Sequence, residues 1–133
     1  MPVNAKLHGK EAEYILQNSG AGLVFTSPGL TEAVAATEAV VRCVDITGPD
    51  YAAALEAQPV AEPVFRAPED LAWLFYTSGT TGRPKGVMIT RESYVRRMQL
   101  ILPSFTPLED DVALAWTPSS FTVMVEEMFL PIL

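Results

Sequence analysis

Two short apolar segments, residues 71–76 and 87–89, lie on either side of a ten-residue stretch that suits neither a helix nor a buried strand. This stretch, residues 77–86, is rich in hydroxyl side chains and glycine, and it has one lysine near its end. Glycine lets backbone N–H groups approach a ligand, hydroxyls donate hydrogen bonds, and lysine adds a compact positive charge. The pattern predicts a strand–loop–strand unit whose loop holds a polyphosphate, and ATP is the polyphosphate we expect.

Two more common loops fit this stretch less well. In a P-loop counted from Gly79, the second glycine would fall at Pro84, and a hydroxyl residue rather than Gly86 would follow Lys85. A P-loop also continues into a helix, whereas residues 87–89 predict a strand. The other alternative is an ordinary hairpin loop rich in turn-forming residues, but such loops usually have about two to five residues and need no lysine.

The segment of residues 76–87, YTSGTTGRPKGV, resembles the phosphate-binding signature of the adenylate-forming (AMP-binding) enzymes without interruption. This superfamily includes acyl-CoA synthetases, the adenylation domains of nonribosomal peptide synthetases, and luciferases. Weaker similarity to the same family occurs at residues 2–4, 13–16, 19–21 and 70–72. Almost the whole chain can therefore be laid along one internal stretch of that family.

The resemblance implies a role for each residue of the loop. The β- and γ-phosphates of ATP would be wrapped by Thr77, Ser78, Gly79, Thr80, Thr81 and Gly82. Lys85 would supply positive charge as the catalytic residue, with Gly86 completing the ATP-binding set. Arg83 is predicted to be a surface residue, and Pro84 to shape the loop. Mg²⁺ is expected to enter with ATP, and no residue is predicted to bind a metal directly.

The resemblance also implies a reaction in two halves. A carboxylate attacks the α-phosphorus of ATP, and the resulting acyl-adenylate is then taken by the thiol of CoA or of a carrier protein. We expect a ligase of the acyl-CoA synthetase type, active in fatty acid metabolism, with a peptide-synthetase adenylation domain as the alternative. The family's downstream adenine, ribose and catalytic-lysine motifs are absent, so the chain is expected to be a fragment that is inactive alone, or a binding remnant.

The C-terminal segment bears on the substrate acid. Residues 121–129 resemble the Phe-Asp-x-Ser segment of amino-acid-activating domains, where the aspartate pairs with the substrate's amino group. Thr122 stands at that position, which disfavours an α-amino acid, while Phe121 replaces the histidine of the Pro-x-x-His pattern common in acyl-CoA synthetases. Four residues could line an acyl pocket or pack in a core, and both interpretations stay open for Tyr94, Trp116, Phe121 and Met124.

Helical and strand patterns alternate through the first half of the chain, which favours an α/β fold with a parallel sheet. Helices are predicted over residues 8–18, 31–40 and 51–57 (the last capped by Asp50), and strands over 23–26 and 41–46. An extended, proline-containing connector follows over about 58–70. Beyond it we expect the strand–loop–strand unit, a helix from Thr90 to about 102, a strand over 112–116 and a helix over 121–133. Residues 1–133 are predicted to form part of one large N-terminal adenylation domain.

The bulk properties exclude several classes of protein. A net charge of −7 argues against a nucleic-acid partner, although residues 83–97 form a basic neighbourhood beside the loop. No apolar run approaches the length of an integral membrane segment, and no secretory signal is present, so a cytoplasmic location is expected. Cys43 is the single cysteine and is predicted to be a core residue rather than a nucleophile. The particular acid and the oligomeric state are not fixed by the sequence.

Overall fold

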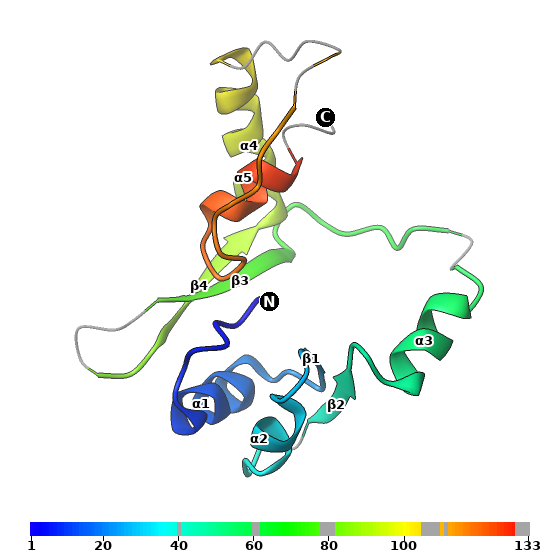
Figure 1. The fold of residues 1–133 in the computed structure, drawn as a ribbon. Coiled ribbons are helices and arrows are strands. Elements are labelled where there is room, and N and C mark those ends of the chain that lie inside the picture. Colours follow the sequence, from blue (N-terminus) through cyan, green and yellow to red (C-terminus); the bar gives the residue numbers. More distant parts are fainter. Residues whose placement is uncertain (40, 60–61, 78–81, 105–109, 111, 130–133) are drawn as a thin grey trace. The chain divides into compact units, whose positions relative to one another are not determined.

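The computed structural model describes residues 1–39, 41–59, 62–77, 82–104, 110 and 112–129 (Figure 1). The described residues form two compact units. The N-terminal unit is drawn from residues 5–64 together with 82–84, and the C-terminal unit from residues 1–4, 65–77 and 85–129. Each unit is described by itself below.

The N-terminal unit contains a parallel pair of strands with helices between and around them. In chain order its elements are α1 (Gly9–Ser19), β1 (Leu23–Thr26), α2 (Thr31–Ala35), β2 (Arg42–Asp45) and α3 (Pro49–Glu56). Leu23 lies opposite Arg42, and Thr26 lies opposite Asp45. Parallel neighbours need a crossover connection, and the segment that contains α2 provides it. The pair confirms the predicted α/β alternation with parallel strands.

Helix α1 is fixed at its start by local hydrogen bonds. The imidazole Nδ1 of His8 accepts from the backbone N–H of Lys10 at 3.3 Å, and the Glu11 carboxylate accepts from the backbone N–H of His8 at 3.1 Å. This reciprocal capping satisfies N–H groups that have no partner inside the helix. On the inner face of the helix, Ile15 and Leu16 are buried. His8, the single histidine of the chain, therefore has a capping role at a helix end.

The other two helices of this unit differ from their predicted bounds. Helix α2 ends at Ala35 rather than near residue 40, and the Thr37 hydroxyl donates to the Val34 carbonyl at 2.7 Å. Such a side-chain bond competes with the backbone bonds that would continue the helix. Helix α3 is capped by Gly48 with Pro49 at its first position, so Asp50 lies in the first turn and is not the cap. Proline is favoured at that position because its fixed φ already suits a helix.

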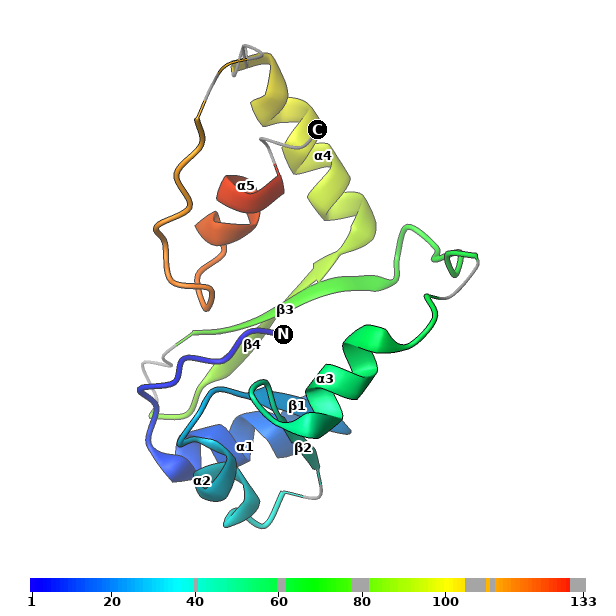
Figure 2. The same cartoon turned by 45° about the vertical axis from the view of Figure 1, so that its right-hand side comes forward.

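The C-terminal unit is an antiparallel hairpin with two helices packed beside it. Its elements are β3 (Leu71–Thr77), β4 (Lys85–Thr90), α4 (Arg91–Ile101), a 3₁₀ turn (Leu102–Ser104) and α5 (Val123–Phe129). Figure 2 shows α4 continuing directly from β4, with α5 beside it. Phe75, Met124 and Val125 form the buried centre, against which Trp73, Ile89, Tyr94 and Phe129 pack. The predicted strand–loop–strand unit is therefore confirmed in its two strands.

The start of α4 is held by its cap and by the segment before β3. Thr90 Oγ1 accepts from the backbone N–H of Ser93 at 3.2 Å, which places the start of the helix where the sequence predicted it. The backbone N–H groups of Arg91 and Glu92 donate to the carbonyls of Asp70 and Pro68, both at 2.9 Å. The first-turn N–H groups of the helix therefore bind to a segment more than twenty residues earlier in the chain.

The predicted strand over residues 112–116 is wrong. The described residues there form no strand, and the side chains of Val112 and Trp116 are 95% and 81% exposed. The backbone N–H groups of Trp116 and Thr117 donate to the Glu127 carboxylate instead of to a neighbouring strand. The predicted final helix begins later, at Val123, and residues 130–133 lie outside the described part of the chain.

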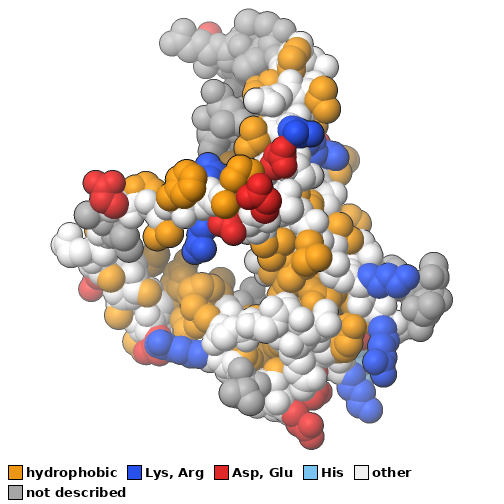
Figure 3. Space-filling model, turned by 180° about the vertical axis from the view of Figure 1, so that it is seen from behind, with side chains coloured by type: hydrophobic (Ala, Val, Ile, Leu, Met, Phe, Trp, Pro, Cys, Tyr) orange, Lys and Arg blue, Asp and Glu red, His pale blue; other side chains and the backbone are white. Residues whose placement is uncertain are grey.

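Large apolar side chains are exposed in both units, among them Leu55, Phe65, Leu100 and Trp116. Figure 3 shows one face on which apolar side chains, in orange, lie between charged ones. Within the described residues, none of the helices has the length and apolar character needed to cross a membrane.

Candidate phosphate-binding site and an adjacent cavity

The strand register brings the two ends of the predicted phosphate loop together. Thr77, the last residue of β3, lies opposite Lys85, the first residue of β4, and Tyr76 lies opposite Gly86. Alternate side chains of a strand point to opposite faces, and those of Trp73 and Phe75 pack in the core of the C-terminal unit. The core therefore anchors β3, and β3 in turn holds the lysine that follows the loop.

Four of the predicted phosphate-binding residues, Ser78, Gly79, Thr80 and Thr81, lie outside the described residues. Their predicted contacts with phosphate stay predictions. The described positions on either side, Thr77 and Lys85, are both exposed.

Lys85 is available to an anionic ligand. Its side chain is exposed, and within the described ranges no carboxylate forms an ion pair with it. An ammonium group that is not already paired keeps its full attraction for phosphate oxygens. The Thr77 residue opposite adds a hydroxyl that can donate to the same kind of oxygen.

Gly86 has a packing role beside that lysine. A Cβ atom added at Gly86 would lie 3.2 Å from Tyr76 Cζ and 3.3 Å from Leu74 Cδ1. The Tyr76 ring therefore lies across the glycine on the neighbouring strand, an arrangement by which an aromatic residue covers a strand glycine. The absence of a side chain at Gly86 lets this cross-strand contact form next to Lys85.

Two further loop residues belong to the N-terminal unit. Gly82 has a φ of 85°, a left-handed conformation that residues with a side chain rarely adopt. The Arg83 guanidinium lies over the Tyr14 ring, 5.9 Å from its centroid. Arg83 is exposed, as predicted, and its charge faces an aromatic ring within its own unit.

The donor set at the end of the hairpin suits phosphate oxygens. Among the described residues it consists of the Thr77 hydroxyl and the Lys85 ammonium group, both of which can donate hydrogen bonds. No cluster of three or more histidine, cysteine or acidic residues that could hold a metal ion occurs within the described residues. The two described donors suit an anionic ligand, and their binding of a polyphosphate stays a prediction.

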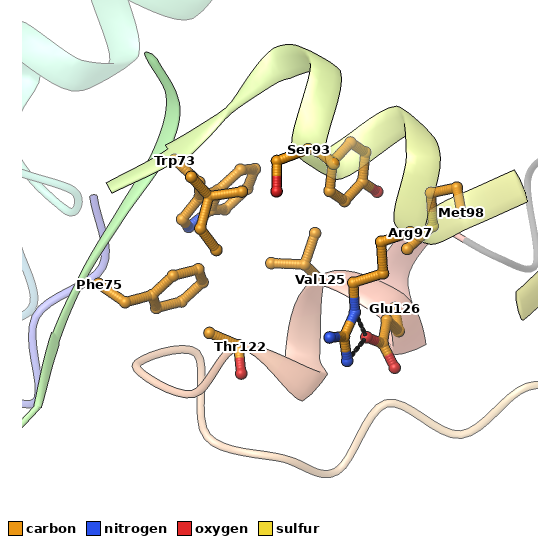
Figure 4. Close-up of a pocket in the computed structure, with 10 residues that line it drawn as sticks. Trp73, Phe75, Ser93, Arg97, Met98, Thr122, Val125 and Glu126 are labelled. Carbon is orange, nitrogen blue, oxygen red and sulfur yellow. Dashed lines mark hydrogen bonds and ion pairs between the residues drawn. The ribbon is translucent and has the colours of Figure 1, made fainter. Parts of the chain in front are cut away.

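A cavity of about 140 Å³ lies in the C-terminal unit, between the hairpin, α4 and α5 (Figure 4). Its wall is mostly apolar and includes Trp73, Phe75, Ile89, Met98 and Val125. The remaining lining residues are polar: Ser93, Tyr94, Arg97, Thr122 and Glu126.

The residues considered for an acyl pocket are distributed unevenly around this cavity. Tyr94 lines it, and Met124 is buried in the core cluster that borders it. Trp116 and Phe121 are 81% and 57% exposed and are not among the lining residues. Thr122, which stands where a related segment has aspartate, does line the cavity.

Sequence reasoning missed an ion pair at the wall of this cavity. The Arg97 guanidinium, on α4, donates to Glu126 Oε1, on α5, across 29 residues of sequence. Arg96, the next residue, instead pairs with Glu92 at 2.6 Å on the same helix. An i,i+4 pair can be anticipated from helical spacing, but a pair between two helices has no such local signal.

Two buried donors at the cavity have unusual surroundings. Neither the Trp73 indole N–H nor the Tyr94 hydroxyl has a hydrogen-bond partner among the described residues. Burial raises the pKa of the Tyr94 hydroxyl, and the negative charge of Glu126 raises it further. Tyr94 therefore remains a neutral donor at physiological pH.

Glu127, the neighbour of Glu126, fastens the preceding segment to α5. Its carboxylate accepts from the Thr117 hydroxyl at 2.6 Å, from the Thr117 N–H at 2.9 Å and from the Trp116 N–H at 3.2 Å. These bonds, led by the Thr117 hydroxyl, lower the pKa of Glu127 because they stabilise its charged form. The two adjacent glutamates thus make different contacts, one with α4 and one with residues 116–117.

Comparison with known proteins gives a consistent result over the whole chain. A family model described as AMP-binding enzyme matches residues 1–133. A linear gramicidin synthase of Brevibacillus parabrevis is 32% identical over 134 residues, covering 100% of this chain and 2% of that protein. Vanchrobactin synthetase VabF of Vibrio anguillarum is 30% identical over 133 residues, covering 100% of this chain and 4% of that protein. Tyrocidine synthase 3 of Brevibacillus parabrevis is 32% identical over 132 residues, covering 99% of this chain and 2% of that protein.

Proposed function

Because this chain belongs to the family of AMP-binding enzymes, we propose that it contributes the phosphate-binding hairpin of an adenylation domain, which activates a carboxylic acid with ATP. The observation that carries this proposal is the exposed Lys85, which pairs with no carboxylate of the described residues and lies opposite Thr77 at the end of a core-anchored hairpin. Membership of the family suggests ATP as the nucleotide, and the donor set at the hairpin supports binding of the ATP phosphates.

The relatives favour a peptide synthetase over an acyl-CoA synthetase as the type of enzyme. Their names describe synthases of gramicidin and tyrocidine and a synthetase of vanchrobactin. The partner that follows from this assignment is a carrier-protein thiol, and CoA is not proposed. The expected role in fatty acid metabolism finds no support among these relatives.

In the proposed reaction, Lys85 and the hydroxyl-rich loop act on the part of ATP that leaves as pyrophosphate. Charge that develops there would be stabilised by hydrogen-bond donors already in place. A hydrogen bond to a charged group is worth about 1.5–3 kcal/mol. Mg²⁺ bound with ATP would supply further positive charge, while the chain's own residues bind and orient the phosphates.

The role of Lys85 can be tested by ATP binding to the purified chain, measured by equilibrium dialysis. We expect Lys85→Ala to weaken binding about tenfold, the equivalent of one charge-assisted contact. Lys10→Ala is the matched control, because it removes the same charge from an exposed position on α1. Equal weakening in the two variants would show that net charge alone matters and would contradict a specific role for Lys85.

The reaction itself can be tested by ATP–pyrophosphate exchange with a panel of amino, hydroxy and aryl acids. The chain spans 2–4% of the length of the three relatives described above. We therefore expect exchange from a protein with the complete domain and none from these 133 residues alone. Exchange by the isolated chain would overturn that expectation, and its absence from the complete domain with every acid would overturn the proposed function.

A further inference from the structure

The cavity of the C-terminal unit has one negative and one positive side chain in its wall. Among its described lining residues, Glu126 and Arg97 are the charged ones. The Glu126 side chain is only 18% exposed, whereas that of Arg97 is 57% exposed. A carboxylate that is largely removed from water is unfavourable unless a partner compensates it. Figure 4 shows the Arg97 guanidinium turned toward the Glu126 carboxylate, and Arg97 is that partner.

The neighbouring arginine on the same helix does something different. Arg96 pairs with Glu92 on α4 itself and is not among the residues that line this cavity. The two adjacent arginines therefore form different ion pairs: Arg96 pairs within α4, and Arg97 pairs with α5 at the cavity. The contrast means that a change at the cavity can be compared with an identical change one residue away.

The size of the cavity limits what it can hold. A cavity of about 150 Å³ with apolar walls can take up benzene, and the cavity described here is about 140 Å³. Its aromatic and aliphatic lining favours an apolar occupant, and Ser93 and Thr122 bring hydroxyl groups to its wall. A cationic occupant would find the nearest carboxylate already compensated by Arg97.

We propose that this cavity binds a compact, uncharged group about the size of a benzene ring, and that Arg97 sets this preference by neutralising Glu126. The charge preference itself depends only on the ion pair, the apolar lining and the size of the cavity.

The proposal is tested by binding two probes of nearly equal shape, benzyl alcohol and benzylammonium. The purified chain is labelled with 5-fluorotryptophan, and the fluorine resonance of Trp73 in the cavity wall is followed during titration. Trp116, which is 81% exposed and outside the cavity, serves as an internal reference. We expect benzyl alcohol to shift the Trp73 resonance alone, and benzylammonium to bind at least about tenfold more weakly.

Three variants then assign the preference to Arg97. Arg97→Met leaves the Glu126 carboxylate uncompensated, so benzylammonium should gain at least about tenfold in affinity. Arg96→Met removes the same charge from the adjacent position and should leave both affinities unchanged. Glu126→Gln removes the carboxylate and should retain binding of benzyl alcohol without any gain for benzylammonium.

Several results would overturn the proposal. The proposal is wrong if benzyl alcohol does not shift the Trp73 resonance of the unaltered chain. It is also wrong if the unaltered chain binds the two probes with equal affinity. Equal effects of Arg97→Met and Arg96→Met on the affinity for benzylammonium would show that Arg97 does not set the charge preference of the cavity. None of these measurements involves ATP, so failure here is distinguishable from failure of the proposed adenylation activity.

Discussion

At the scale of single residues, the candidate site depends on the lack of a side chain at Gly86 as much as on the charge of Lys85. The motif could be read from the sequence because its hydroxyls, glycines and lysine are contiguous. The reason for a glycine at position 86 could not be read from the sequence, because Tyr76 and Leu74 contact this position from the neighbouring strand. Only the register of the hairpin brings these side chains together.

Gly86→Ala is expected to lower the free energy of unfolding by about 1–3 kcal/mol, because the added methyl group overpacks against Tyr76 and Leu74. The measurement is urea unfolding followed by tryptophan fluorescence. Combining it with Tyr76→Ala, which removes the crowding ring, should cost little more than Tyr76→Ala alone. Fully additive losses would show that the two positions do not act through their contact.

At the scale of elements, prediction succeeded where local signals set the bounds. Helices α1 and α4 begin beside His8 and Thr90, whose side chains cap the first turn. It failed for residues 112–116, whose apolar character suggested a strand. There the backbone N–H groups of Trp116 and Thr117 donate to the carboxylate of Glu127 on α5. The local sequence pattern does not predict this contact, because Glu127 lies ten or more residues away in the chain.

The attachment of that segment to α5 should depend on pH through Glu127. Because hydrogen bonds lower the folded-state pKa of Glu127 below its ordinary value of 4.5, its contribution to stability is present above that pH and is lost as the pH falls further. We expect the stability difference between the unaltered chain and Glu127→Gln to shrink between pH 7 and pH 3. Urea unfolding at a series of pH values measures it, and a difference that stays constant over that range would contradict the role of these hydrogen bonds.

At the scale of the whole molecule, the described residues form two compact units. The alternation of helix and strand predicted the parallel pair of the N-terminal unit. The two apolar segments beside the glycine- and hydroxyl-rich stretch predicted the hairpin of the C-terminal unit. The described residues just before β3 include exposed side chains, with Phe65 86% exposed, whereas Phe75 within β3 is 1% exposed.

Brief treatment with chymotrypsin should therefore cut after Phe65 well before it cuts after Phe75. A protease needs an accessible backbone segment, and the interior of a paired, buried strand does not offer one. Mass spectrometry of the early fragments provides the measurement, and Phe65→Ala should remove the fragments that end at residue 65. Early cleavage after Phe75 would show that the hairpin is less stable than its burial indicates.

The sequence by itself determined the family to which the chain belongs, the two strands of the hairpin and the helices whose caps lie next to them in the chain. These features depend on interactions between residues a few positions apart, so they can be recognised from short stretches of sequence. The tertiary structure alone decided that Arg97 meets Glu126, that Glu127 holds residues 116–117, and that Tyr76 covers Gly86. Each of these contacts joins residues from different elements, and the packing of the hairpin against α4 and α5 decides which side chains come within reach.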